Sequence, residues 1–302
     1  MSIQHQQTIQ TGIRPNPSLI KTIVQLFKLR IVTLLLFASM GGAFLAAGRV
    51  PTISQLVILF VAGGLGAAGA SALNQYLERN SDHAMKRTAQ RPLVNGTVNA
   101  ELVLAVALAM VFVPVGLLLF SNPPMAFFIL MGAIIYVVVY TVWLKPRSAL
   151  NIVIGGAAGS CAVLTGSAAV GNWDATGALI LALLLFFWTP AHFWSLAIMV
   201  RDDYAAANIP MLPVTTDTRT TAIWGFIHAA CVGALTILLN LDPALGLLYI
   251  VPSTLMTYYF LKQSWQLIQQ PDKVQAKKTF LTSNGFLALI LLSICLSIMF
   301  GI

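Results

Sequence analysis

Three polar side chains at regular spacing stand out in a polar segment that lies between two long apolar runs. Asn74, Glu78 and Asp82 lie four residues apart, so on a helix they share one face. Two carboxylates on one face offer the oxygen ligands that a hard cation such as Mg²⁺ prefers. The basic residues that follow within about two helical turns are Lys86, Arg87 and Arg91. The pattern indicates either a site for a metal-bound phosphate or diphosphate, or a solvated, charged helix end at a membrane surface.

The helix that carries these side chains should be long and should end near a proline. Pro92 disfavours helical geometry at the preceding residue, so we expect the helix to end at Arg91. Apolar runs at about 53–76 and 100–120 flank the polar segment, and each is long enough to cross a membrane. The segment is therefore expected at the membrane surface.

A second acidic pair follows another apolar run. Asp202 and Asp203 are adjacent, so on a helix they point about 100° apart and at most one of them would squarely face the first pair. Bringing three or four carboxylates together is electrostatically costly without a cation. The pair is therefore either part of a shared metal site or a surface pair that contacts Arg201.

A histidine precedes this acidic pair inside the apolar run. His192 lies ten residues before Asp202, which is about 15 Å along a helix and places it within the membrane. Ionisable residues at that depth are candidates for function. The alternative is a hydrogen bond between two helices.

The composition indicates what kind of protein positions these residues. The chain of 302 residues is 58% hydrophobic and 9% charged, with a mean hydropathy of +0.84. Soluble domains carry about 25% charged residues, so this chain is expected to be a polytopic membrane protein. Its net charge of +8 follows from loops at a membrane surface, and we expect no nucleic-acid partner.

The number and orientation of the membrane-spanning helices follow from the apolar runs and the basic residues. Nine runs of suitable length occur, at about 31–48, 53–76, 100–120, 125–144, 149–170, 177–200, 222–241, 244–261 and 280–300. Sixteen of the 17 Lys and Arg residues precede the first run or lie in or beside the loops after even-numbered runs, and Arg49 is the exception. Basic residues concentrate in cytoplasmic loops. We therefore expect an all-α integral membrane protein with nine transmembrane helices, a cytoplasmic N-terminus and an external C-terminus.

Taken together, the polar residues resemble a known family. The likeness is carried by Asn74-x₃-Glu78-x₃-Asp82, then by Met85-Lys86-Arg87-Thr88 and Arg91-Pro92-Leu93. These stretches resemble the first aspartate-rich motif of the UbiA family of intramembrane prenyltransferases. In that family the first carboxylate is usually Asp, whereas here it is Glu78. The likeness runs from about Lys28 to the last apolar run and implies one membrane-embedded prenyltransferase domain over 28–302, and we expect the polar N-terminal segment over 1–27 to lie on the cytoplasmic side.

Within the family, further stretches resemble the members that use haem as the prenyl acceptor. These stretches are His192–Trp194, Asp202–Tyr204, Ile209–Pro213 and Asn151–Ala157. The resemblance implies transfer of a farnesyl group from farnesyl diphosphate to a vinyl group of haem B, which gives haem O for terminal oxidases. It also implies a cell membrane of a bacterium or archaeon, a cytoplasmic active site, and a downstream haem-modifying enzyme as a partner in addition to the lipid bilayer.

The resemblance assigns roles to the residues by position. It implies that Mg²⁺ is bound by Asn74, Glu78, Asp82, Asp202 and Asp203, of which the four carboxylates are the catalytic residues. It implies that the diphosphate is bound by Lys86, Arg87, Arg91 and Arg201. His192 would contact the haem.

Two other functions compete with this interpretation. A prenyltransferase of the same family could act on an aromatic precursor of a quinone, although His192 and the stretch 209–213 favour haem. A secondary transporter would bind its ions near the middle of the membrane. Here the acidic residues cluster at one surface, which disfavours transport.

Overall fold

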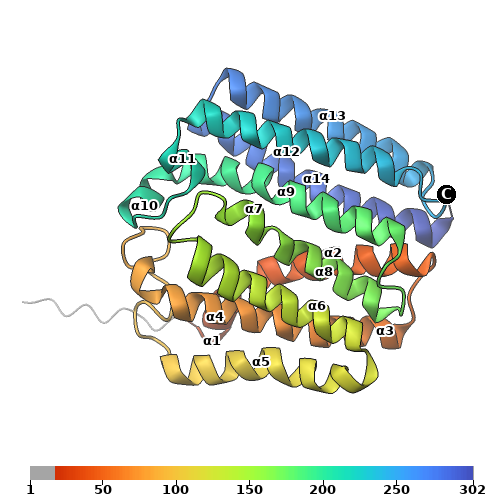
Figure 1. Cartoon of the computed structure of the whole chain (residues 1–302), viewed down its shortest axis with the longest axis horizontal. Coiled ribbons are helices and arrows are strands. Elements are labelled where there is room, and N and C mark those ends of the chain that lie inside the picture. The colour runs from red at the N-terminus through yellow and green to blue at the C-terminus, as the bar shows by residue number, and fades with distance from the viewer. Residues whose placement is uncertain (1–17, 302) are drawn as a thin grey trace, which may run out of the picture.

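The computed structural model describes residues 18–301, and this part of the chain is built from α-helices and two π-helical stretches without a strand (Figure 1). Nine long helical segments run back and forth across the molecule. Their bounds are α2 Leu29–Ala47, α3 Ile53–Ile58 continued by η1 Leu59–Gly63 and α4 Gly64–Asp82, α5 Ala100–Ser121, α6 Pro123–Ala133 continued by η2 Ile134–Leu144, α7 Asn151–Gly155 with α8 Ala157–Ala169, α9 Thr176–Met199, α12 Thr218–Leu239, α13 Leu247–Gln269 and α14 Lys273–Phe300. Three short helices lie outside these segments, namely α1 Leu19–Leu26, α10 Arg201–Ala206 and α11 Leu212–Thr215.

Eight of the long segments in the described part of the chain are long and apolar enough to cross a membrane, which confirms the prediction of an all-α, multi-pass membrane protein. The remaining segment, α13, has 23 residues and is long enough to cross, but Thr257, Tyr258 and Tyr259 make its middle less apolar. The count of nine spans and the orientation in the membrane therefore stay predictions. Residues 1–17 of the predicted polar segment lie outside the described residues.

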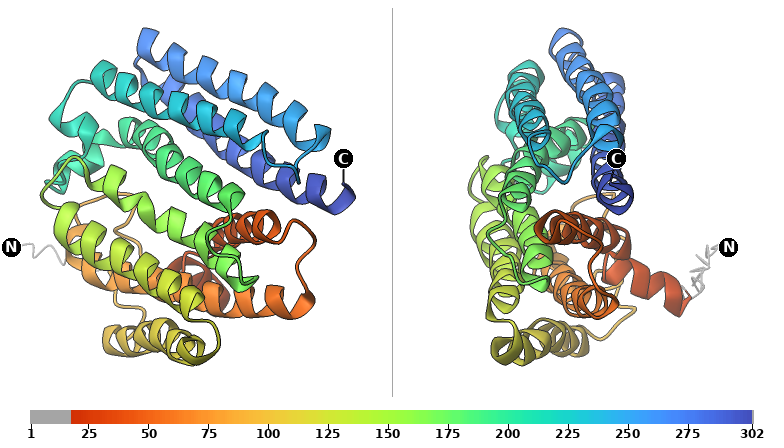
Figure 2. Two further views of the ribbon diagram at one scale, coloured as in Figure 1. Left: turned by 45° about the vertical axis from the view of Figure 1, so that its right-hand side comes forward. Right: turned by 90° about the vertical axis from the view of Figure 1, so that its right-hand side faces the viewer.

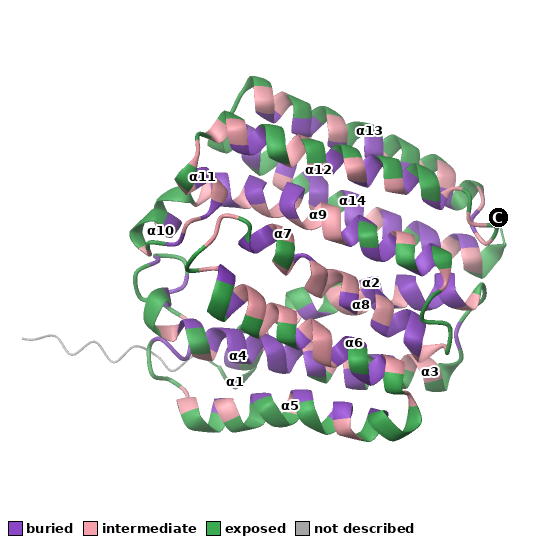
Figure 3. Ribbon diagram, viewed as in Figure 1, coloured by how far each residue is buried: buried purple, intermediate pink, exposed green. Residues whose placement is uncertain are grey.

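The helices pack through small residues and leave large apolar side chains on the outside. At the crossing of α2 and α8, a Cβ atom on Gly166 would lie 1.7 Å from the carbonyl oxygen of Ser39, so no other residue fits there. Figure 3 shows exposed stretches along α5, and the exposed side chains of this helix include Phe112, Leu117 and Phe120. Exposed apolar area of this kind is expected where lipid surrounds the protein.

The polar loops gather at one end of the bundle. Figures 1 and 2 show the loop after α4, the start of α7 and helices α10 and α11 together at this end, whereas α3 and the C-terminal end of α14 lie at the other. An ion pair between Lys273 at the start of α14 and Asp202 of α10 joins two of these loops. The fold thus brings the two acidic segments of the sequence to the same end.

Candidate active site

The end of α4 carries the first polar group as the sequence predicted. Asn74, Glu78 and Asp82 all lie on this helix and are buried, with Asp82 fully inaccessible. Their partners come from other elements, because Asn74 Nδ2 donates to Thr141 Oγ1 at 2.9 Å and Lys145 Nζ donates to Glu78 Oε1 at 2.5 Å. Buried carboxylates require such partners, since an isolated buried charge is costly. These buried side chains form the centre of the candidate site.

The helix ends earlier than the sequence predicted. We expected α4 to continue to Arg91, but it ends at Asp82 and the chain then turns back. Two local bonds stabilise this end, because Thr88 Oγ1 and the amide of Met85 both donate to the carbonyl oxygen of Asp82, at 3.0 and 3.3 Å. The reversal brings Arg91 Nη1 to 2.5 Å from Asp82 Oδ2 and to 3.7 Å from Glu78 Oε2. One guanidinium therefore bridges both carboxylates, which a continuous helix would not allow.

Lys145 belongs to the site although the sequence analysis did not single it out. It follows η2 directly, and the π-helical turns of η2 stack the rings of Tyr136 and Tyr140, with centroids 5.9 Å apart. The Lys145 ammonium lies 5.9 Å from the Tyr140 ring centroid while it pairs with Glu78. Its position at the end of the fourth apolar run, on the side of the acidic loops, is the signal that could have identified it.

Lys28 is a second cation of the site, although its place in the sequence indicates only the topology. It adopts a left-handed backbone conformation, with φ 48°, between α1 and α2. Its ammonium donates to Asn74 Oδ1 at 2.6 Å and to the Tyr136 hydroxyl at 3.0 Å. Burial, and then the neighbouring charge of Arg91, lower the pKa of Lys28 from its usual 10.5 to about 8. A non-glycine residue in this conformation is uncommon and often marks a functional position.

The other predicted diphosphate ligands lie around this centre, with more exposure. Lys86, Arg87 and Arg201 are exposed, whereas Arg91 is largely buried. Arg87 is close enough to Tyr204 to oppose the rise that burial causes in the pKa of that phenol. The largely buried cations of the site are therefore Lys28, Arg91 and Lys145.

The second acidic segment reaches the site through an aromatic residue and not through its carboxylates. Tyr204 of α10 is buried in one apolar cluster with Met85 from the loop after α4. Asp202 instead faces outward and accepts a bond from Lys273 Nζ at 3.0 Å, and this bond holds the pKa of Asp202 below its usual range. Asp203 is only partly buried. The alternative of a surface ion pair thus describes Asp202 in this structure, although its partner is Lys273 and not Arg201.

The donor set near Asp82 suits a hard cation. Among residues 18–301, no three His, Cys, Asp or Glu side chains are arranged as a metal site, so the predicted five ligands are not assembled together. Two observations nevertheless fit Mg²⁺. The donors present are carboxylate oxygens of Glu78 and Asp82, and Asp82 Oδ1 is buried without a hydrogen-bond partner. A buried oxygen without a partner requires an explanation, and a bound cation would satisfy it.

His192 makes specific contacts between two helices. Its Nδ1 lies 2.8 Å from the Ser283 hydroxyl of α14, and its ring stacks between Trp188 and Phe280, with centroids 4.2 and 4.6 Å away. The predicted alternative of an inter-helix hydrogen bond is thus present. The flanking aromatics come from one turn earlier in α9 and from α14, and not from the neighbouring Phe193 and Trp194. Contact with haem stays a prediction for His192.

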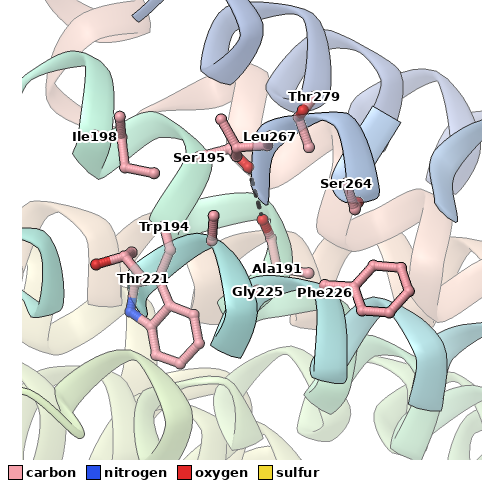
Figure 4. Close-up of a pocket in the computed structure, with 11 residues that line it drawn as sticks. Ala191, Trp194, Ser195, Ile198, Thr221, Gly225, Phe226, Ser264, Leu267 and Thr279 are labelled. Atoms are coloured by element: carbon pink, nitrogen blue, oxygen red, sulfur yellow. Dashed lines mark hydrogen bonds between the residues drawn. The ribbon is translucent and has the colours of Figure 1, made fainter. Parts of the chain in front are cut away.

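A small pocket lies behind this part of α9 (Figure 4). Trp194 and Ser195 line it together with Thr221 of α12 and Thr279 of α14. Its volume is about 10 Å³, which is room for one water molecule. The indole nitrogen of Trp194 is buried without a protein partner, and one water would satisfy it. The pocket is too small for haem or a prenyl chain, so it is not the acceptor site.

The helical fold and the buried carboxylate and cation cluster define an intramembrane prenyltransferase. Residues 34–290 match the model of the UbiA prenyltransferase family, so the chain belongs to this family. A protoheme IX farnesyltransferase from Sulfurisphaera tokodaii is 40% identical over 277 residues, which cover 90% of this chain and 91% of the relative. An enzyme of the same name from Metallosphaera sedula is 38% identical over 273 residues, covering 90% of this chain and 94% of the relative.

Solved structures confirm the fold at low sequence identity. A structure of digeranylgeranylglyceryl phosphate synthase superposes with a TM-score of 0.78 at 15% identity, and covers 92% of this chain and 98% of its own. A UbiA homologue from Archaeoglobus fulgidus, solved with DMAPP and Mg²⁺, gives a TM-score of 0.64 at 16% identity, and covers 90% and 99%. The arrangement of helices in this chain is therefore that of the UbiA family.

Proposed function

We propose that this protein transfers the farnesyl group of farnesyl diphosphate to a vinyl group of haem B, which gives haem O. The observation that carries this proposal is the 40% identity to a protoheme IX farnesyltransferase over 90% of the chain. The buried cluster at the end of α4 supports it, because a diphosphate leaving group requires cations in a site from which water is excluded.

The reaction begins at the bond between the farnesyl group and the diphosphate, which lies next to the cations of the site. The C–O bond between the farnesyl carbon and the diphosphate breaks, and positive charge spreads over the allylic carbons. Arg91, Lys145 and Lys28 stabilise the negative charge that develops on the departing diphosphate, and their own hydrogen bonds hold them in place before the reaction. The allylic carbon then bonds to the terminal carbon of the vinyl group, which leaves positive charge on the neighbouring carbon. Water adds to that carbon and releases a proton, which leaves a hydroxyl group there.

Magnesium fits this site through Glu78 and Asp82. When bound it would supply a Lewis acid for the diphosphate oxygens. A UbiA homologue has been solved with Mg²⁺ and DMAPP, which supports the same dependence here. Asn74 stabilises the arrangement, because its amide contacts both Lys28 and Thr141. Because Asp202 faces outward and pairs with Lys273, we expect Asp202 and Asp203 to join Glu78 and Asp82 only when substrate binds, and we expect His192 to orient the haem.

The orientation of the protein belongs to the same proposal. The site faces the cytoplasm of a bacterial or archaeal cell, as the distribution of basic residues indicates. The product passes to a later haem-modifying enzyme. In a background without native cysteines, Gln90→Cys should be labelled from the cytoplasmic side and Asn172→Cys from the outside. Labelling of both from one side would contradict this orientation.

One assay tests the proposed reaction and both alternatives. Purified protein is incubated with haem B, farnesyl diphosphate and Mg²⁺, and the product is analysed by mass spectrometry. We expect haem to gain one farnesyl group and one hydroxyl group, with release of diphosphate. Unchanged haem together with prenylated 4-hydroxybenzoate would establish the quinone-precursor alternative. Vesicle uptake without any prenylated product would establish a transporter.

A further inference from the structure

The imidazole ring of His192 is covered on both faces, so it acts through its edge. The Trp188 ring stacks on it with centroids 4.2 Å and planes 13° apart, and the Phe280 ring of α14 does so at 4.6 Å and 28°. Two rings stacked this closely do not share one face of an imidazole. The two ring nitrogens lie on the free edge, and one of them, Nδ1, lies 2.8 Å from Ser283 Oγ.

The hydrogen bonds of Ser283 decide which nitrogen of His192 carries the proton. A serine hydroxyl has one hydrogen to donate, and Ser283 Oγ donates it to the carbonyl oxygen of Phe280 at 2.7 Å. The hydroxyl therefore accepts from His192, so Nδ1 is protonated and Nε2 has a free lone pair. The other tautomer would instead leave an N–H group at Nε2 without a protein partner, which is unusual inside a protein.

The Nε2 atom of His192 is free to contact a substrate. In the described part of the chain, the hydrogen bond of this side chain is made through Nδ1 alone. The side chain is partly exposed, and Nε2 is not sealed off in the way that the partnerless indole nitrogen of Trp194 is. A neutral imidazole nitrogen with a free lone pair is a metal ligand or a hydrogen-bond acceptor.

This part of α9 borders the cluster of carboxylates and cations. Phe193, the next residue along the helix, contacts the ring of Tyr204, with centroids 6.4 Å apart. The phenol of Tyr204 is in turn close enough to Glu78 and Arg91 for their charges to act on it. A substrate held at His192 is therefore adjacent to the place where the diphosphate is expected to bind.

We propose that His192 ligates the iron of the haem substrate through Nε2, and that Ser283 is the positioning residue that keeps this nitrogen unprotonated. This inference rests on the proposed function, because that function makes haem the acceptor. The edge of haem B carries methyl, vinyl and ionised propionate groups, none of which donates a hydrogen bond, so the iron is the partner for the lone pair. Histidines that bind a metal usually donate their other ring N–H to a neighbouring group, as Nδ1 does here.

Ligation orients the haem without any change in bonding at its edge. The lone pair of Nε2 forms a dative bond to the iron, and no proton leaves, because this nitrogen carries none. The stacked rings of Trp188 and Phe280 fix the plane of the imidazole and thereby the tilt of the macrocycle. One vinyl group can then be held against the allylic carbon of the prenyl donor.

The first experiment compares haem B with iron-free protoporphyrin IX. Binding of each to the full-length protein is measured by titration of the visible absorption. His192→Ala should weaken haem binding at least about tenfold and leave protoporphyrin IX binding unchanged, which also shows that the variant is folded. The absorption spectrum of bound haem should lose the features of an imidazole ligand, and free imidazole should restore them. Equal weakening of both porphyrins, or an unchanged haem spectrum, would overturn the ligation.

The second experiment tests the positioning role of Ser283. Ser283→Ala removes the hydroxyl but keeps the main-chain carbonyl that accepts from Trp188 Nε1 at 3.0 Å. Haem binding should weaken about tenfold with a weaker imidazole signature, and Ser283→Thr, which keeps a hydroxyl, should retain both. The matched control is Ser293→Ala on the same helix, because Ser293 Oγ donates only to the carbonyl oxygen of Leu289. Parent-like affinity and spectrum in Ser283→Ala would overturn this role.

The ligation and the proposed reaction fail in different ways. A protein that binds haem through His192 but adds no farnesyl group to it would contradict the reaction and leave the ligation in place. Farnesylation of haem by a His192→Ala variant with the haem spectrum of the parent would contradict the ligation and leave the reaction in place. Absence of haem binding by the parent protein would contradict both.

Discussion

The two acidic segments lie at the same end of the bundle, but their surroundings are opposite. Asp82 is completely buried and bonded to Arg91, whereas the side chain of Asp202 is 83% exposed and pairs with Lys273, whose side chain is 63% exposed. Exposed ion pairs contribute little to stability, whereas breaking a buried pair is strongly unfavourable. The first segment is therefore organised before substrate binds. The second is free to rearrange, so its contribution to the site depends on what binds.

The largest effect should come from the buried carboxylate. Asp82→Asn keeps the shape of the side chain but removes the charge beside Arg91 and a predicted metal ligand. We expect kcat/KM to fall by about 10²–10³-fold, the usual consequence of losing a group that stabilises developing charge. Product formation is measured by mass spectrometry, with the thermal unfolding midpoint as the control for folding. Near-normal activity at saturating Mg²⁺ would contradict the assignment.

A loss of about 10²-fold is expected for Lys145→Met, because Lys145 contacts Glu78 and carries one of the buried charges. The matched control is Arg147→Gln. Arg147 lies two residues further along and donates only to the backbone of Val142 and Trp143. Steady-state kinetics on both variants would separate a local requirement from the general effect of removing a cation. Equal losses in both would show that Lys145 has no specific role.

A smaller loss is expected at the junction of α1 and α2. Lys28→Gln removes a charged hydrogen bond to Asn74, which is worth at least about 1.5 kcal/mol, so kcat/KM should fall about tenfold or somewhat more. Tyr136→Phe removes only the second partner of Lys28 and should have a milder effect. If Tyr136→Phe were the more damaging change, the tyrosine and not the lysine would be the functional group.

The smallest effect on the unfolding midpoint is expected in the second acidic segment, which carries Asp202 and Asp203. Asp202→Asn and Lys273→Gln should leave the unfolding midpoint unchanged within the reproducibility of the measurement, because both side chains are exposed. A clear fall in this midpoint would contradict the contrast between the buried first acidic segment and the exposed second one. Activity measurements sharpen this contrast. A loss of activity in Asp202→Asn but not in Lys273→Gln would show that the Asp202 carboxylate joins Glu78 and Asp82 when substrate binds.

The sequence was sufficient for the features that depend on local spacing. The apolar runs predicted the membrane helices, and the spacing of Asn74, Glu78 and Asp82 predicted their common helix face. The end of α4 was predicted wrongly, since Pro92 acts only on its neighbour, whereas the bonds at Asp82 end the helix nine residues earlier. Such bonds depend on the tertiary structure and leave no periodic signal.

The cations of the site show the same limit of prediction from the sequence, because their roles depend on the tertiary structure. Arg91 was predicted because it is close to the carboxylates in sequence, but Lys28 and Lys145 reach them from distant parts of the chain. Both had been counted only as markers of topology. A basic residue at the end of a membrane helix serves equally well as a marker or as a ligand, so its role emerges only when the facing helix is known.

The π-helical winding of η2 makes the length of this segment part of the chemistry. In an α-helix, nine residues turn through about 900°, which would place Lys145 opposite Tyr136. In η2 the hydrogen bonds span five residues, so both residues reach the site: the Tyr136 hydroxyl accepts from Lys28, which also donates to Asn74 of α4, and the Lys145 ammonium donates to Glu78 on the same face of α4. A single-codon deletion between these positions that restores α-helical winding would rotate the ammonium away from Glu78 without altering any residue of the site. Insertions and deletions in this span should therefore be as damaging as substitutions of the charged residues themselves.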